Sequence, residues 1–158
     1  MMRKADREVK DRGELIAILE KCDVCRIGLA LGGVPYIVPM NFGYEMDGDD
    51  LILYLHCAKE GRKLDFIAQN PNACFEMDCS HELKPGTEPC NYSMNYESII
   101  GSGLISVCEE KDEKIHGLTQ LMRGLSAEKT FHFPDKVLDQ TAVLKFSVTE
   151  FTGKRLRK

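Results

Sequence analysis

The sequence has no tryptophan and no long apolar run. A membrane-spanning helix needs roughly 18 consecutive apolar residues. No segment approaches that length, so we expect no membrane partner. The opening segment, MMRKADREVKDR, carries charges of both signs and lacks the apolar stretch of a secretory signal. We therefore expect a cytoplasmic protein.

Two common nucleotide-binding motifs are also missing. The sequence contains neither GxxxxGKS/T nor GxGxxG, so nucleoside triphosphate and Rossmann-type sites lose their main support. The net charge of −4 argues against broad nucleic-acid binding, because a polyanion requires a basic surface. The seven cysteines are an odd number, and without an export signal we interpret them as reduced thiols.

The 158 residues fit a single domain, residues 1–158, with one hydrophobic core. Leu15, Ile18, Leu19 and Cys22 share one face of a helix, and Asp11 precedes them as a candidate N-cap. Two further helices are predicted at 62–69 and 112–125, and 126–140 is predicted to be irregular. Strands are predicted at 24–30, 35–44, 51–56, 73–78, 92–107 and 141–149.

Short turns join consecutive strands in this pattern. It indicates a mainly β fold of the α+β class: a six-stranded antiparallel barrel with peripheral helices. Side chains fill the interior of so small a barrel, so a large ligand is expected outside it or between subunits. Gly101 and Gly103 are candidate bulge positions in the long strand.

Residues 56–63, HCAKEGRK, combine features of an anion site. They span a strand end and a helix start, where free N–H groups and a partial positive charge attract anions. Lys59, Arg62 and Lys63 add positive charge, and Gly61 allows the backbone to approach a ligand. The alternative interpretation is that these lysines are ordinary solvated charges on a helix.

The strand PYIVPMNFGY is unusual because Pro39 cannot donate to a sheet. It implies an edge, bulge or twist, whose free backbone groups and the Asn41 amide could meet a flat heterocycle. A barrel seam without any ligand is an equally good interpretation at this point.

Four segments in order, YIVPMNFGY, LYLHCAKEGRKLD, NPNACFEMD and YESIIGSG, resemble the pyridoxamine-phosphate-oxidase-like FMN-binding split barrels. Within that group the chain most resembles the Nim-type nitroimidazole-resistance proteins. The resemblance implies a six-stranded split β-barrel that forms a homodimer with flavin sites at its interface. The flavin is expected to be FMN, with FAD as the alternative, because both carry the same first phosphate.

The resemblance also implies roles for individual residues. The isoalloxazine edge would be lined by Val38, Pro39, Met40, Asn41 and Phe42. The ring and ribityl chain would lie against His56, Cys57 and Ala58, although many relatives have a small residue in place of Cys57. The phosphate would be held by Lys59, Gly61, Arg62 and Lys63. Glu97 and Ser98 would approach from the partner subunit.

The implied activity is flavin-dependent reduction of the nitro group of an imidazole, a small-molecule substrate. His56 is the candidate proton donor, although it could instead only hydrogen-bond at a strand end. The missing tryptophan and the ending FTGKRLRK count against vitamin B6 oxidation. We interpret the basic residues of that ending as a solvated tail.

Two alternatives remain open from the sequence. The protein could bind flavin or haem without turnover, with His56, His81 or His116 as a haem ligand. Cys22 and Cys25 have the CxxC spacing of a zinc or redox site, which Cys79 and Cys90 could complete. Cys22 also fits the apolar helix face, and we expect no metal.

Overall fold

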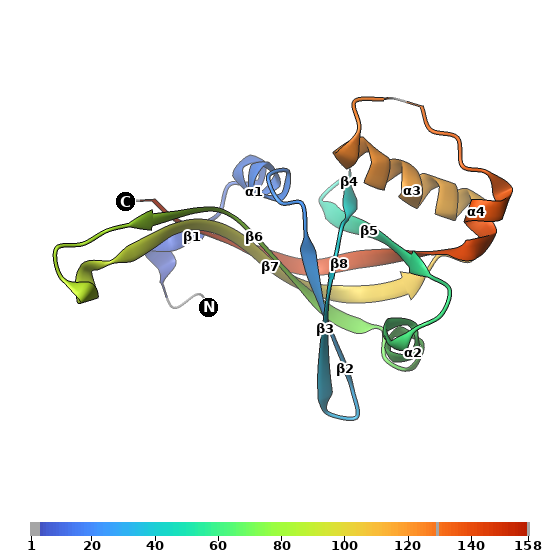
Figure 1. Cartoon of the computed structure of the whole chain (residues 1–158), viewed down its shortest axis with the longest axis horizontal. Coiled ribbons are helices and arrows are strands. Elements are labelled where there is room, and N and C mark those ends of the chain that lie inside the picture. The colour runs from blue at the N-terminus through green and yellow to red at the C-terminus, as the bar shows by residue number, and fades with distance from the viewer. Residues whose placement is uncertain (1–3, 129, 158) are drawn as a thin grey trace.

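The computed structural model describes residues 4–128 and 130–157. Its strands form one antiparallel sheet in the order β3-β2-β6-β7-β8-β5-β4, and β1 pairs with β8 (Figure 1). The strands are β1 Glu8–Val9, β2 Cys25–Leu31, β3 Val34–Met40, β4 Gly43–Asp47, β5 Asp50–Ala58, β6 Asn72–Lys84, β7 Ser93–Val107 and β8 Thr141–Leu156.

In the described part of the chain, four helices and two short 3-10 helices lie around this sheet. They are α1 Arg12–Leu19, α2 Arg62–Gln69, α3 Lys111–Leu125, α4 Asp135–Gln140, η1 Ala5–Arg7 and η2 Pro89–Asn91. Within the described residues, no helix is long and apolar enough to cross a membrane.

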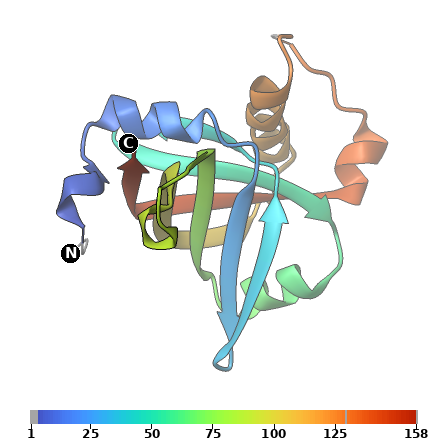
Figure 2. The same ribbon diagram turned by 60° about the vertical axis from the view of Figure 1, so that its left-hand side comes forward.

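The sheet is curled but not closed. β3 and β4 follow each other in the chain, yet they stand at opposite ends of the strand order. The β2–β3 hairpin runs across the direction of β5 and β8 (Figure 2). This open seam between β3 and β4 is the split of the predicted split barrel.

Local sequence accounts for the turns around the split. Asp11 caps α1 as predicted, its side chain accepting a hydrogen bond from the Glu14 N–H at 2.9 Å. Gly32 and Gly33 take φ values of 57° and 81°, which a tight β2–β3 hairpin requires and which glycine adopts without strain.

Apolar side chains from alternate strand positions fill the inside of the curl. Phe75 and Phe146 meet edge to face with ring centroids 5.7 Å apart, and both are buried. A smaller cluster, which includes Leu118, Leu121 and Leu138, packs α3 and α4 against the outer side of β8 and β5. The interior is therefore packed, as predicted for a small barrel.

The predicted bulge in the long strand is confirmed. The β7–β8 register shifts between Ser102 and Gly103. A Cβ at Gly103 would overlap the Ser147 carbonyl of β8, and one at Gly101 would overlap the Phe75 ring. Glycine is needed at both positions because the strands cross so closely there.

The structure corrects several predicted boundaries. Residues 4–128 and 130–157 contain eight strands rather than six, because β1 was missed and segment 35–44 divides into β3 and β4 at Asn41 and Phe42. Segment 126–140, predicted to be irregular, contains α4. β6 continues through part of the expected polar loop, because the chain forms a hairpin there instead of leaving the sheet.

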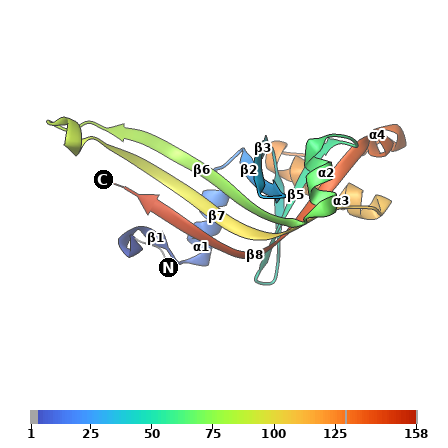
Figure 3. The same ribbon diagram turned by 90° about the horizontal axis from the view of Figure 1, so that it is seen from below.

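That hairpin, residues 80–96, forms an arm at the opposite end of the molecule from α3 and α4 (Figures 1 and 3). A register shift between Cys79 and Glu82 marks its base, where Ser80 has a positive φ of 58°. β8 also runs on to Leu156, well past the predicted end at 149.

Candidate functional site

The predicted phosphate cradle lies where β5 gives way to α2. Gly61 is the N-cap of α2, and its φ of 136° is accessible to glycine but rarely to other residues. No side chain caps the helix, so its first N–H groups have no partner from a capping residue. A helix start of this kind attracts anions through its free N–H groups and its dipole.

Arg62, the first residue of α2, is held in place by two aromatic rings. Its guanidinium carbon lies 4.9 Å from the ring centroid of Tyr36 on β3 and 5.2 Å from that of Phe66. The two rings are themselves 5.3 Å apart. Stacking on ring faces orients a guanidinium while leaving its N–H groups free for a ligand. The contact with Tyr36 also joins α2 to β3.

The three cations of the cradle have no anionic partner within the described chain. Neither Lys59, Arg62 nor Lys63 forms an ion pair with any carboxylate in residues 4–128 and 130–157. Most other arginines among the described residues do form such pairs, for example Arg26 with Asp78 and Arg155 with Glu97. The cradle thus concentrates unpaired positive charge in a protein that is acidic overall.

β3 supplies the predicted ring-facing residues from an edge of the sheet. Val38 and Met40 are half-buried against the core, whereas Pro39 is exposed on the other face. Asn41 donates a hydrogen bond through its Nδ2 to the Asp23 carbonyl at 2.8 Å, which fixes the passage from β3 to β4. Phe42 is buried in the core.

The end of β5 divides its residues between two faces. His56 and Ala58 are exposed on the outer face, and the His56 ring makes no hydrogen bond within the described residues. Cys57 points toward the core and is half-buried. Burial raises the pKa of the Cys57 thiol, and the charge of Lys63 opposes that shift. His56 and Cys57 therefore cannot both face one side of a ligand.

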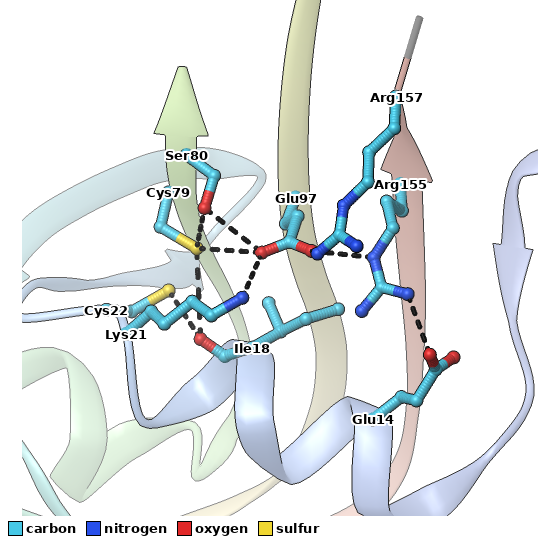
Figure 4. Close-up of polar contacts among 9 residues, drawn as sticks. All are labelled: Glu14, Ile18, Lys21, Cys22, Cys79, Ser80, Glu97, Arg155 and Arg157. Atoms are coloured by element: carbon cyan, nitrogen blue, oxygen red, sulfur yellow. Dashed lines mark hydrogen bonds and ion pairs between the residues drawn. The ribbon is translucent and has the colours of Figure 1, made fainter. Parts of the chain in front are cut away.

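Glu97 lies at the centre of a polar cluster inside its own chain (Figure 4). Its carboxylate is 1% exposed and accepts hydrogen bonds from Lys21 at 2.7 Å, Ser80 at 3.0 Å, Arg155 at 2.6 Å and Arg157 at 2.7 Å. We call these five residues the Glu97 cluster. Burial alone would raise the pKa of Glu97, but the four hydrogen bonds outweigh it and lower the pKa to about 2.

The Glu97 cluster corrects the prediction of a solvated basic tail. Arg155 and Arg157 are structural partners of a buried carboxylate, a role that their position near the chain end concealed. Ser98, the next residue on β7, pairs with Asp78 and Lys154 in the sheet. That Glu97 and Ser98 approach a ligand on a partner subunit stays a prediction.

A cavity of about 630 Å³ opens between α1, β4 and α3. We call it the α1–α3 cavity, and Leu19, Cys22, Phe42, Tyr44 and Arg123 are among its lining residues. Phe42 is the one predicted flavin residue in its wall. Its volume falls within the range of small-molecule sites.

A polar network that no sequence motif predicts lies beside this cavity. Glu45 accepts hydrogen bonds from the Tyr54 hydroxyl at 2.6 Å and from Gln120 at 3.1 Å, and its Oε2 lies 2.6 Å from His116 Nε2. Burial alone would raise the pKa of Glu45. The hydrogen bonds with Tyr54 and His116 outweigh that effect, so the pKa of Glu45 lies below its usual value. His116 and Gln120 lie 71 and 75 residues from Glu45 in the chain, and the packing of α3 on β4 brings them together.

The residues of the haem and metal alternatives do not form one site. His81 pairs with Asp78 at 2.7 Å and His116 pairs with Glu45, so each imidazole already has a carboxylate partner. Cys90 is exposed in η2 on the arm, whereas Cys25 is buried at the start of β2. Across the residues that the structure describes, no three metal-ligating side chains gather to hold an ion.

Comparison with known proteins places this geometry in a family. The model of the pyridoxamine 5'-phosphate oxidase family matches residues 11–155, which include every predicted site residue. The chain belongs to this family. No curated protein shows significant similarity to the chain.

Solved structures of related proteins agree with the assignment. A candidate 5-nitroimidazole antibiotic resistance protein from Bacteroides thetaiotaomicron is 35% identical, with a TM-score of 0.81, covering 94% of this chain and 86% of that one. This similarity confirms the predicted likeness to the Nim-type members of the pyridoxamine 5'-phosphate oxidase family.

Two more distant structures share the fold of the family. A flavocytochrome from Azotobacter vinelandii is 22% identical, with a TM-score of 0.82, covering 100% of this chain and 73% of that one. A FAD- and haem-binding protein from Mycobacterium smegmatis is 18% identical, with a TM-score of 0.82, covering 96% of this chain and 74% of that one.

Proposed function

We propose that the protein is a flavin-dependent oxidoreductase of the nitroreductase type. It binds FMN with the phosphate at the start of α2 and the ring along the edge of β3. FAD carries the same first phosphate and is the alternative cofactor. The family assignment and the names of the three similar structures, one for nitroimidazole resistance and two for flavin or flavocytochrome, support this proposal.

The proposal rests on how Arg62 is placed: its side chain is held by aromatic rings and its charge is not paired within the described residues. A guanidinium that is stacked on Tyr36 and Phe66 and lacks a carboxylate partner is ready to bind a phosphate. Gly61 leaves open space beside it, because a Cβ at that position would meet no described atom within 4 Å. The residues present therefore fit the phosphate end of a flavin.

The protein's own groups would position the reactants. Hydride transfer is the chemistry that a flavin supplies when it is bound. The exposed His56 imidazole, on the outer face of β5, is free to donate a proton to a reduced substrate atom or to hold the substrate. We assign the nitro group of a nitroimidazole as the substrate class, on the basis of the 35% identical protein from Bacteroides thetaiotaomicron.

A second copy of the chain would complete the site as a homodimer. One face of the sheet carries exposed apolar side chains on two strands that β2 and β6 separate: Ile37 on β3 is 68% exposed, and Ile100 and Leu104 on β7 are 56% and 50% exposed. Exposed apolar side chains gathered on one sheet face are typical of a protein interface. We propose that this face is covered by the same face of a second subunit.

The test begins with the visible spectrum of the purified protein. A flavin spectrum at about one copy per chain supports the proposal, and heat release followed by chromatography distinguishes FMN from FAD. A Soret band would instead favour the haem-binding alternative. A colourless protein that does not take up added flavin would refute flavin binding.

The Arg62→Ala variant then tests the phosphate site itself. Losing a charge-assisted pair to a phosphate costs about 2 kcal/mol, so flavin affinity should fall roughly thirtyfold in equilibrium dialysis. Arg12→Ala is the matched control, because Arg12 is also the first residue of a helix and lies over an aromatic ring, that of Phe151 at 5.9 Å. Equal affinity in the two variants would remove Arg62 from the site.

A further inference from the structure

Two cysteines that lie far apart in the sequence meet at one carbonyl group. The Cys22 thiol, just after α1, donates to the Ile18 carbonyl oxygen with a sulfur–oxygen distance of 3.3 Å. The Cys79 thiol, on β6, points at the same oxygen from 3.9 Å (Figure 4). Both sulfur atoms therefore lie beside the same carbonyl oxygen, between α1 and β6.

The electrostatics of Cys22 agree with this geometry. The pKa of the Cys22 thiol is raised, first by burial and then by the nearby Cys79 thiol. The CxxC spacing suggested Cys25 as the partner of Cys22. The structure places Cys25 in β2 instead, fully buried, and provides Cys79 as the neighbour of Cys22.

The two thiols differ in access. Cys79 is half-exposed at the base of the arm, 3.6 Å from the Ser80 hydroxyl. Cys22 is 9% exposed and lines the α1–α3 cavity. A reagent would therefore reach Cys79 first, and Cys22 is placed behind it to complete the reaction.

We propose that Cys22 and Cys79 are a site of reversible oxidation, which a small disulfide such as oxidised glutathione converts to an intramolecular disulfide. The Cys79 thiolate attacks one glutathione sulfur, forming a mixed disulfide and releasing the first glutathione thiolate. The Cys22 sulfur, losing its proton to solvent, attacks Cys79 and releases the second glutathione. The protein loses two electrons and two protons, and one oxidised glutathione becomes two reduced molecules.

The position of this bond gives it a structural consequence. It would tie the end of α1 to the base of the arm, directly beside Lys21 and Glu97 of the Glu97 cluster. It would also fix the wall that Cys22 contributes to the α1–α3 cavity. Oxidation is thus expected to raise the melting temperature and to change access to that cavity.

The experiment uses the full chain, with Cys74 and Cys90 replaced by serine because both are exposed and could form links between molecules. The reduced protein is incubated with oxidised glutathione, the remaining thiols are alkylated, and the digest is mapped by mass spectrometry. The expected product has lost two hydrogen atoms and contains a linked Cys22–Cys79 peptide, which dithiothreitol separates. The result does not depend on bound flavin.

Matched variants decide which pair reacts. Adding Cys25→Ser should leave the disulfide intact, whereas adding Cys22→Ser should stop the reaction at glutathionylated Cys79. The proposal is overturned if Cys22 and Cys79 are both recovered alkylated, if glutathione stays on Cys79 while Cys22 is present, or if Cys22 pairs with Cys25. Circular dichroism of each variant confirms that these results come from folded protein.

Discussion

Replacing Glu97 by glutamine tests how much the Glu97 cluster contributes to stability. Hydrogen bonds from Lys21, Ser80, Arg155 and Arg157 lower the pKa of Glu97 from 4.5 to about 2 despite its burial. Each pKa unit is worth about 1.4 kcal/mol, so the ionised carboxylate stabilises the folded state by about 3 kcal/mol at neutral pH. Glu97→Gln should therefore lower the free energy of unfolding by about that amount at pH 7.

The pH dependence gives a sharper test than the single value. Because the pKa is lower in the folded state, the stabilisation is complete above the unfolded value of 4.5 and is lost as the pH falls toward 2. Between pH 7 and about pH 3.5, the stability difference between wild type and Glu97→Gln should shrink by about 1.5 kcal/mol. Urea unfolding of both proteins at each pH, at one fixed protein concentration, measures this difference in the free energy of unfolding.

Glu150→Gln is the control for the Glu97→Gln measurement. Glu150 lies on β8 of the same sheet, is exposed, and accepts one hydrogen bond from Ser102. Glu150→Gln should change stability by less than about 0.5 kcal/mol at either pH. A Glu97→Gln difference that stays constant with pH would show that the carboxylate titrates normally, and the argument from its three cations would be wrong.

Two other predictions concern the proposed activity and assembly. The His56→Ala variant should keep its flavin, but a 5-nitroimidazole should oxidise its photoreduced flavin about a hundredfold more slowly under anaerobic conditions. That factor is the low end of what a positioned proton donor contributes. An unchanged rate would leave His56 with only a structural role. Ile100→Glu should shift the protein from dimer to monomer in analytical ultracentrifugation, because a carboxylate is costly to bury in an apolar interface. Val137→Glu, at a 48% exposed site on α4, should remain dimeric; if Ile100→Glu also stays dimeric, the interface lies elsewhere.

Much of the fold could be predicted because its signals are local. The Asp11 cap, the 62–69 helix and the glycine bulge of β7 each depend on a few adjacent residues, and all are confirmed. The missed features depend on contacts between distant segments. β1 is two residues long and exists only because β8 continues beside it.

The candidate site divides in the same way. The cationic turn proposed as a phosphate cradle could be located because a strand end, a glycine and three cations fall within eight residues. No spacing rule could find that Arg62 stacks on Tyr36, that Glu45 meets His116, or that Arg155 binds Glu97, because tertiary packing alone brings these pairs together.

The edge strand β3 must remain accessible to a ligand and yet not pair with a strand of another molecule. A strand left unpaired so that a ligand can reach it is also a template on which another chain can add a strand and begin to aggregate. Pro35 and Pro39 are four residues apart, so both lie on the same side of β3, and neither nitrogen carries a hydrogen. The carbonyl oxygens on that side remain available to a donor on a small ligand, whereas an incoming strand would find two N–H groups missing. The prolines therefore make strand addition less favourable at this edge while leaving it open for binding.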